Sequence, residues 1–286
     1  SQAFLMLISA SLFWRLYGNS KESIRWPWFL TLTFVPTVFA LVLGQIAPLV
    51  LASIAAFSHF EEKENDVAAG VFLVLASVKP HLIYLFWFVL LLWIYHHGRW
   101  RVGLGAAAAG LVAATLPLLF DSMIYAKYLA LFQRADLPLP MDLAAPTLRN
   151  AGVKFFQTGE TWMRIVPTVG ACIWSVYYWH CHRQDWYWAE RLPLILLVSL
   201  VTSPWTWTFD QIVFVPAVLQ GATWAIRRER PWFTSAAVIL YVVIETLHIF
   251  LRFFVAVDFW YFWLAPALLV NYLIFLRGAA HNRLSV

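Results

Sequence analysis

The sequence predicts an all-α fold, a polytopic transmembrane helical bundle of about eleven hydrophobic helices, several of them short and paired as hairpins. Of the 286 residues, 62% are hydrophobic and only 12% are charged, and the mean hydropathy is +0.71. A soluble domain carries about 25% charged residues and cannot bury this much apolar surface. Apolar windows of about 20 residues recur along the chain, as transmembrane helices require. The seventeen Trp and eleven Tyr suit aromatic belts at the membrane interfaces.

The predicted elements form one transmembrane domain over 1–286. Five simple spans alternate with three apolar stretches that are too long for one comfortable crossing. The beginning of the chain has no Met and no basic region ahead of an apolar core, so we expect no signal peptide and interpret the chain as the C-terminal part of a longer protein. The simple spans are 3–17, 103–120, 161–180, 232–254 and 259–276, and the long stretches are 27–59, 68–97 and 192–226.

Each long stretch is predicted to be a helical hairpin with a polar tip. In 68–97 a proline follows Lys79, so the helix cannot continue smoothly, and an ammonium inside an apolar run is costly unless it meets water, a partner or a ligand. The alternative for 27–59 and 68–97 is one long span each, which gives the same orientation downstream. The polar tips are Gly44-Gln45, Lys79-Pro80-His81, and Ser203-Pro204 followed by WTWTFDQ.

Short basic loops predict the orientation, because cytoplasmic loops carry an excess of Lys and Arg. The longest polar segment, 121–160, is then an outer, periplasmic loop, and the three tips face the same outer side. The net charge of +5 is scattered over these loops, so we interpret it as a topology signal and expect no nucleic-acid partner. The loops predicted to be cytoplasmic are 18–26, 98–102, 181–191, 227–230 and 277–283.

Two of the tips offer polar groups to a ligand. Lys79 and His81 form a candidate cationic site for a phosphate, although a Lys at a helix end also extends to the interface for its own solvation. Gln45 follows a glycine that permits a turn, and its amide can both donate to and accept from a hydroxyl-rich ligand. The alternative is a kink that Gln45 satisfies with its own side chain.

The third tip combines aromatic rings with a carboxylate. Trp205, Trp207 and Asp210 suit a sugar, whose apolar face stacks on aromatic rings. The alternative places the two indoles in the interfacial belt and Asp210 at the beginning of a helix. In the outer loop, Arg149-Asn150 is a further candidate for a phosphate-bearing lipid, with three other cations nearby in sequence. These cations are Lys127, Arg134 and Lys154.

Other ionisable residues carry weaker signals. Glu245, His248 and Arg252 share one helix face, so we expect either an internal ion network or a contribution to the outer cavity. The two cysteines are interpreted as packing residues. No metal site and no cofactor are expected, because the remaining carboxylates lack a diagnostic spacing. The outer carboxylates are Asp121, Asp136, Asp142 and Asp258.

Several motifs then appear in an order and spacing typical of one family. They are LGQ at 43–45, AG at 69–70, KPH at 79–81, RW at 99–100, YAKYL at 125–129 and SPWTW at 203–207. Over about 1–230 the sequence resembles the bacterial family-87 glycosyltransferases. These are integral membrane enzymes of the GT-C superfamily, and polyprenol-phosphate-mannose-dependent mannosyltransferases belong among them. The outer loop departs from the family pattern, because Leu148-Arg149-Asn150 stands where an Asn-Gln-Ser-like step is often found.

The resemblance implies an enzyme of the bacterial inner membrane with a periplasmic active face. It implies transfer of a hexose such as mannose, with inversion, from a polyprenyl-phosphate sugar to a glycolipid or glycan acceptor. Lys79, His81 and Arg149 would bind the donor phosphate, and Gln45, Trp205 and Asp210 would hold the sugar or the acceptor.

The catalytic base of this superfamily is an Asp of the first periplasmic loop. We therefore expect the base upstream of Ser1 and expect this stretch alone to be inactive, with Asp210 as the remaining candidate within it. Two other functions stay open. A secondary transporter also uses broken helices and intramembrane charges, but it would show inverted repeats. A non-catalytic membrane scaffold is the second alternative.

Overall fold

Helices make up nearly all of the described chain, which confirms the predicted all-α class. The computed structural model describes 2–18, 25–133, 145–156, 161–227 and 231–279, and these ranges contain no β-strand. The α-helices are α1 (Gln2–Leu16), α2 (Arg25–Thr33), α3 (Val35–Val42), α4 (Ala47–Glu62), α5 (Asp66–Phe72), α6 (Tyr84–His97), α7 (Trp100–Thr115), α8 (Ile124–Phe132), α9 (Leu148–Phe156), α10 (Thr161–His182), α11 (Trp188–Thr202), α12 (Val215–Arg227), α13 (Pro231–Arg252) and α14 (Leu264–Ala279). The short 3-10 helices are η1 (Leu73–Val78), η2 (Pro80–Ile83), η3 (Leu116–Leu119), η4 (Arg183–Asp185), η5 (Thr208–Phe214) and η6 (Asp258–Tyr261).

Five helical stretches are long and apolar enough to cross a membrane, which fits the predicted multi-pass protein. A sixth arises if α2 and α3 are one span, and these two helices meet at an angle of 71°. The count of about eleven hydrophobic helices is not confirmed, since α1, α4 and α11 have only 15 or 16 residues each. The five stretches are Pro80–His97, Trp100–Leu119, Thr208–Arg227, Pro231–Arg252 and Asp258–Gly278.

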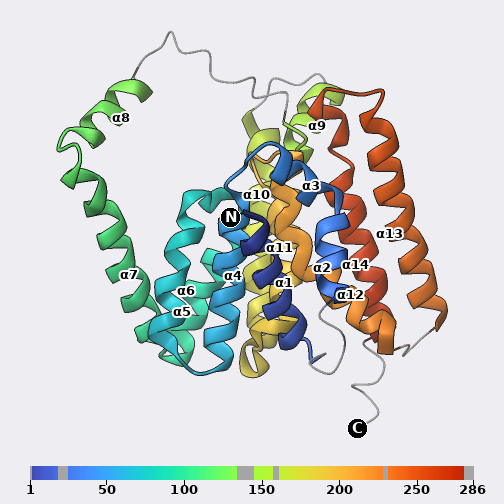
Figure 1. Ribbon diagram of the computed structural model, residues 1–286, viewed down its shortest axis with the longest axis horizontal. Helices are drawn as coiled ribbons and strands as arrows, with labels where there is room; N and C mark the ends of the chain where they lie inside the picture. The colour runs from blue at the N-terminus through green and yellow to red at the C-terminus, as the bar shows by residue number, and fades with distance from the viewer. Residues whose placement is uncertain (1, 19–24, 134–144, 157–160, 228–230, 280–286) are drawn as a thin grey trace.

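Each of the three long stretches reverses its direction at the polar tip. Asp66, at the beginning of α5, lies 3.0 Å from Arg99, just after α6, so the chain between them runs out and back. Gln220 donates to the carbonyl oxygen of Ala189 at 3.0 Å, which places late α12 beside the beginning of α11. Figure 1 shows the same reversal between α3 and α4.

Local backbone chemistry explains the turns. Gly44 has a φ of +63°, in the left-handed region where a side chain is disfavoured, so a glycine suits this turn. The Lys79 backbone is not helical, with a φ of −141° and a ψ of 64°, and Pro80 has no N–H with which to continue η1. After α11, Pro204 similarly prevents continuation of the helix beyond Ser203.

The turns gather at two opposite ends of the molecule. The turn between α3 and α4 and helix α9 lie toward the upper end in Figure 1, and the contacts of Ser203 with His81 and of Arg149 with Pro204 join the other two tips to α9. The loops around 62–66, 97–100 and 183–187 lie at the lower end. The basic loops that predict the cytoplasmic side are therefore grouped at one end, in so far as they fall within the described residues.

Helix α11 passes through the centre of the bundle and positions the upper end. Ile195, Leu197 and Leu200 have at most 1% of their surface exposed, and so do the aromatic rings packed near the beginning of the helix. Trp188 contacts Phe57 and Phe86 with ring centroids 5.2 and 5.3 Å apart. This packing is typical of a protein interior and fixes the helix that carries the third tip.

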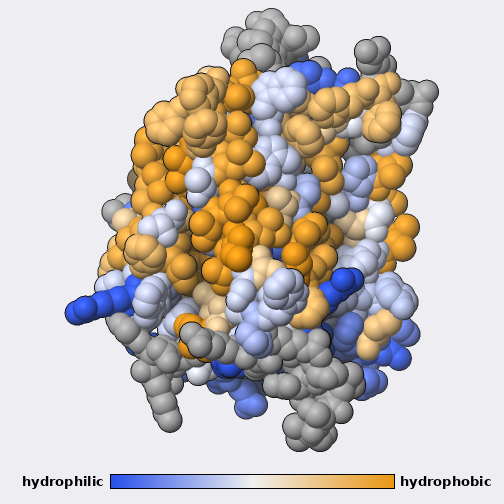
Figure 2. Space-filling view, turned by 90° about the vertical axis from the view of Figure 1, so that its right-hand side faces the viewer, coloured by the Kyte–Doolittle hydropathy of each residue, from blue (hydrophilic) through white to orange (hydrophobic). Residues whose placement is uncertain are grey.

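The outer surface is apolar around the middle of the molecule. Figure 2 looks onto the side where α13 lies and shows hydrophobic residues across its central part, with hydrophilic residues mainly near the lower end. Val242 and Ile249 of α13 are about half exposed, as expected for a helix whose outer face meets lipid.

Candidate active site

The site at the upper end begins with polar contacts that join two hairpins. The Ser199 hydroxyl of α11 donates to the carbonyl oxygen of Leu82 at 3.0 Å. The Tyr84 and Thr202 hydroxyls lie 2.7 Å apart. The Ser203 hydroxyl lies 3.2 Å from the carbonyl oxygen of His81. These contacts hold the second and third tips together, so residues far apart in sequence share one site.

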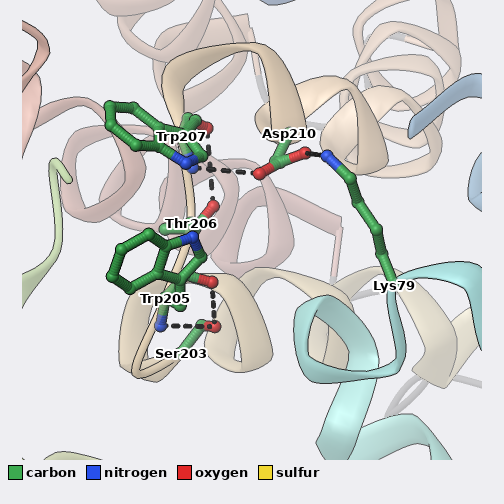
Figure 3. Close-up of polar contacts among 6 residues, drawn as sticks. All are labelled: Lys79, Ser203, Trp205, Thr206, Trp207 and Asp210. Atoms are coloured by element: carbon green, nitrogen blue, oxygen red, sulfur yellow. Dashed lines mark hydrogen bonds and ion pairs between the residues drawn. The ribbon is translucent and has the colours of Figure 1, made fainter. Parts of the chain in front are cut away.

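Lys79 and Asp210 form an ion pair across this junction. The Lys79 Nζ lies 2.6 Å from the Asp210 Oδ1, although 131 residues separate the two in the sequence. Asp210 Oδ2 accepts the Trp207 N–H at 3.0 Å, so both carboxylate oxygens are engaged (Figure 3). The Asp210 side chain is 1% exposed and that of Lys79 is 16% exposed. The carboxylate is thus enclosed, while the Lys79 side chain is partly exposed.

An aromatic row extends from this pair. The Lys79 Nζ lies 5.0 Å from the centroid of the Phe209 ring, a cation–π distance. Phe209 stacks on Trp207 with centroids 6.3 Å apart, and Trp207 meets Trp205 edge to face at 6.0 Å. In Figure 3 the two indoles project from one side of their loop, and Lys79 approaches Asp210 from the other. The rings and the ammonium therefore present different surfaces to a ligand.

Arg149 joins the same end from α9. Its Nη1 donates to the carbonyl oxygen of Pro204 at 3.2 Å, which brings the predicted outer segment onto the third tip. Its buried Nε has no hydrogen-bond partner among the described residues. The neighbouring Asn150 donates to the carbonyl oxygen of Ala145 at 2.9 Å and is 1% exposed, so it fixes the beginning of α9.

The other predicted residues lie at varying distances from this centre. His81 is half-buried beside Lys79 and contributes its backbone oxygen to the contact with Ser203. Gln45 is half-buried at the turn between α3 and α4, and both helices pack against η5, which carries Asp210. Among the contacts of the described residues, the Gln45 side chain has no hydrogen bond to the other candidates.

Two of the carboxylates predicted on the outer side form ion pairs that do not involve Lys79 or Asp210. Asp121 pairs with the exposed Lys127 at 2.6 Å, and Asp258 pairs with Arg252. Arg134, Asp136 and Asp142 lie outside the described residues. Within the described ranges, no group of three His, Cys, Asp or Glu side chains is placed to hold a metal ion.

The ionisable residues of α13 lie in separate environments and have no contact with the Lys79 pair among the described residues. Glu245 Oε2 accepts the Val35 N–H at 2.8 Å, at the beginning of α3. His248 is 0% exposed, and Phe39 and Tyr261 lie beside it with centroids 5.8 and 5.1 Å away. Within the described part of the chain, no hydrogen bond or ion pair joins Glu245, His248 and Arg252 to one another, so the contacts support neither an ion network of the three nor a shared site with Lys79.

Several residues of the site are not anticipated from the sequence. Ser199, Tyr84 and Thr202 join the hairpins, but single hydroxyls inside apolar helices usually bond their own backbone and give little signal. Gln211 is a clearer case, because it follows Asp210 and is 0% exposed with neither amide atom partnered among the described residues. A Gln inside an apolar segment is the signal that points to it.

The fold and the site define a multi-pass helical membrane protein with a polar, aromatic-lined centre at one end of the bundle. The family model of glycosyltransferase family 87 matches residues 1–204. This match covers more than half of the chain, so the chain belongs to glycosyltransferase family 87. It includes Lys79, His81 and Arg149 and ends just before Trp205. No curated protein and no solved structure matches the chain.

Proposed function

We propose that this membrane glycosyltransferase moves a hexose such as mannose from a polyprenyl-phosphate donor to a glycolipid or glycan acceptor. The reaction takes place at the upper end of the bundle, which faces the periplasm of a bacterial inner membrane. The observation that carries the proposal is the Lys79–Asp210 pair, which places a partly exposed Lys side chain at the end of an apolar bundle. An anionic lipid head meets such a group when its chain lies in the bilayer.

In this proposal, Lys79, Arg149 and His81 bind the donor phosphate. An ammonium has three N–H donors, and Asp210 occupies one, so Lys79 retains donors for phosphate oxygens. Arg149 adds a guanidinium whose Nε is unpartnered among the described residues, and charge-assisted hydrogen bonds to phosphate are strong. His81 lies beside Lys79 and supplies a further contact.

Asp210 acts as a positioning residue for Lys79. A general base must reach the acceptor hydroxyl, but the Asp210 side chain is 1% exposed and is held by Lys79 and the Trp207 N–H. This geometry argues against Asp210 as the catalytic base. We propose instead that Asp210 holds the ammonium in place, and we assign the base to no described residue.

The sugar stacks on the indole of Trp205 or Trp207, and Gln45 hydrogen-bonds to the sugar or acceptor hydroxyls. The acceptor hydroxyl loses its proton to the general base and attacks the anomeric carbon, the bond from that carbon to the lipid phosphate breaks on the opposite face, and the configuration inverts. Because the phosphate is a good leaving group, orientation and stabilisation of its negative charge supply most of the catalysis.

The test is Lys79→Ala in the protein in its native membranes, with transfer measured from polyprenyl-phosphate mannose. Loss of one charge-assisted contact of about 1.5–3 kcal/mol predicts a fall of about 10- to 100-fold. Lys127→Ala is the matched control, because Lys127 is an exposed outer Lys that pairs with Asp121. Undiminished transfer by Lys79→Ala would remove the pair from the mechanism, and transfer from a nucleotide sugar alone would overturn the proposed donor.

A further inference from the structure

A second candidate binding site lies away from the Lys79 pair. A cavity of about 580 Å³ opens between α1, α2, α12, α13 and α14. This volume falls within the range of about 300–1,000 Å³ that is typical of small-molecule sites. None of the residues proposed for sugar transfer lines it, and η5 meets it at Phe214, at the opposite end of that helix from Asp210.

The cavity opens toward the side of the molecule that meets lipid. Phe29 and Trp26 of α2 line it on one side and Val242 of α13 on the other, and each of these side chains is more than half exposed. The surface around α13 is apolar in Figure 2, and α13 is itself long enough to span a membrane. A ligand therefore enters from the bilayer, so an aliphatic chain is the chemistry that the walls accept.

Two of the polar side chains in the cavity wall have a buried acceptor atom without a partner among the described residues. Glu245 is 9% exposed, and its Oε2 accepts the Val35 N–H, but its Oε1 has no partner among the described residues. Asn271 of α14 also lines the cavity, is 5% exposed, and has an Oδ1 with no partner in the described chain. Buried acceptors without a donor are unfavourable, so their presence in a cavity wall indicates a ligand that donates a hydrogen bond.

The charge pattern restricts the head group of that ligand. An anionic head is excluded, because both orphan atoms are acceptors and Glu245 is itself acidic. A cationic head would have to leave water for an apolar cavity, which is costly even beside a carboxylate. A hydroxyl donates a hydrogen bond at a much smaller desolvation cost than an ammonium.

We propose that this cavity binds a single-chain lipid alcohol, with its aliphatic chain along α13 and its hydroxyl donating to the unpartnered Oε1 of Glu245. This site stands independently of the sugar-transfer reaction. Because Glu245 also caps α3 at the bend between α2 and α3, the bound alcohol contacts the group that fixes this bend.

The experiment uses hexadecanol with a diazirine in its chain, photolysed with the protein in native membranes, and the labelled peptides are identified by mass spectrometry. The comparison probe is the methyl ether of the same molecule, which has the same chain but no hydroxyl donor. We expect the alcohol to label the peptides of α2, α13 and α14 several-fold more than the ether does. Labelling of α7 measures contact with bulk lipid and should be equal for the two probes.

Two variants make the test specific, and a thermal unfolding curve confirms that each is folded. Glu245→Gln still accepts the Val35 N–H but presents an amide donor to the cavity, so it should abolish the preference for the alcohol. Ala222→Phe fills the cavity from α12 and should reduce labelling by both probes at α13. Equal labelling by alcohol and ether in the unchanged protein, or a preference that survives Glu245→Gln, would overturn the proposal.

Discussion

The charge of Lys79 would destabilise an apolar segment if it had no partner, and the contact with Asp210 offsets this cost. The Lys79 ammonium ends an apolar run, and Asp210 neutralises it from a segment 131 residues away. Removing one partner of a buried pair costs about 3–5 kcal/mol, because the other charge stays buried without compensation. Since Lys79 is partly exposed, we expect the effect here to lie toward the lower part of that range.

A double-mutant cycle separates the stability of this pair from its function. Lys79→Met and Asp210→Leu should each lower the unfolding temperature in detergent, whereas the double variant should recover most of the loss, because neither charge is then left buried alone. Sugar transfer should stay low in all three variants if the ammonium binds the donor phosphate. Recovery of transfer in the double variant would contradict that role and leave Lys79 with a structural one.

Glu61, near the end of α4, predicts a pH dependence of stability. Burial raises the pKa of its carboxyl from an ordinary value of 4.5 to about 7, although Arg99 opposes the shift. The folded state therefore holds this proton more tightly than the unfolded state. The related stability is fully present below the ordinary pKa and is lost as the pH rises through about 7.

Glu61→Gln removes this dependence, because the amide is neutral at every pH. Relative to the unchanged protein, its unfolding temperature should rise more at pH 8 than at pH 5, by a few degrees. The exposed neighbour Glu62 offers the control, and Glu62→Gln should shift the unfolding temperature little at either pH. A gain for Glu61→Gln that is equal at both pH values would show that its carboxyl is not the cause.

At the scale of the element, α5 and α7 pack through two glycines. A Cβ at Gly70 would lie 2.0 Å from the carbonyl oxygen of Val102, and one at Gly105 would lie 2.5 Å from that of Val67. Both atoms belong to the backbone, so neither contact can be relieved by rotation of a side chain. Small residues that allow helices to approach closely are typical of packing in membranes.

Gly70→Ala should therefore separate the two helices and destabilise the protein by about 1–3 kcal/mol, the usual cost of overpacking. Gly110→Ala is the matched control, since Gly110 lies in α7, the partner helix, but a Cβ there would meet nothing within 4 Å. Thermal unfolding in detergent measures both variants. Equal unfolding temperatures for the two would show that the close contact is absent in the membrane.

The elements also show how far the sequence predicts the fold and the site. The hairpin tip at Lys79 could be predicted because length, Pro80 and the cost of a buried ammonium agree. The 71° bend between α2 and α3 is not predicted, although Pro36 follows it directly, because residues 27–43 contain no glycine and no charged residue that would mark a turn. The Lys79–Asp210 contact could not be predicted, because no local pattern specifies a pairing across 131 residues.

At the scale of the whole molecule, the two ends of the bundle are expected on opposite sides of the membrane, so they should differ in their access to a reagent added outside the cell. If the upper end is periplasmic, Met123→Cys should react with an impermeant maleimide in intact cells, and Gln184→Cys should react only after permeabilisation. Both positions are exposed, and both variants are made in a background with Cys172 and Cys181 replaced by Ser. The reverse pattern would invert the orientation and place the candidate site on the cytoplasmic side.

The distance between Lys79 and Asp210 along the chain also has a consequence for biosynthesis. At roughly 5–20 residues per second, the ribosome completes Asp210 about 7–26 s after Lys79. During that interval the ammonium has no carboxylate partner and is stable only near water. We therefore expect the tip of the 68–97 hairpin to stay at the membrane surface during that interval. The Lys79–Asp210 contact forms only when the hairpin of α11 and α12 has been inserted beside it.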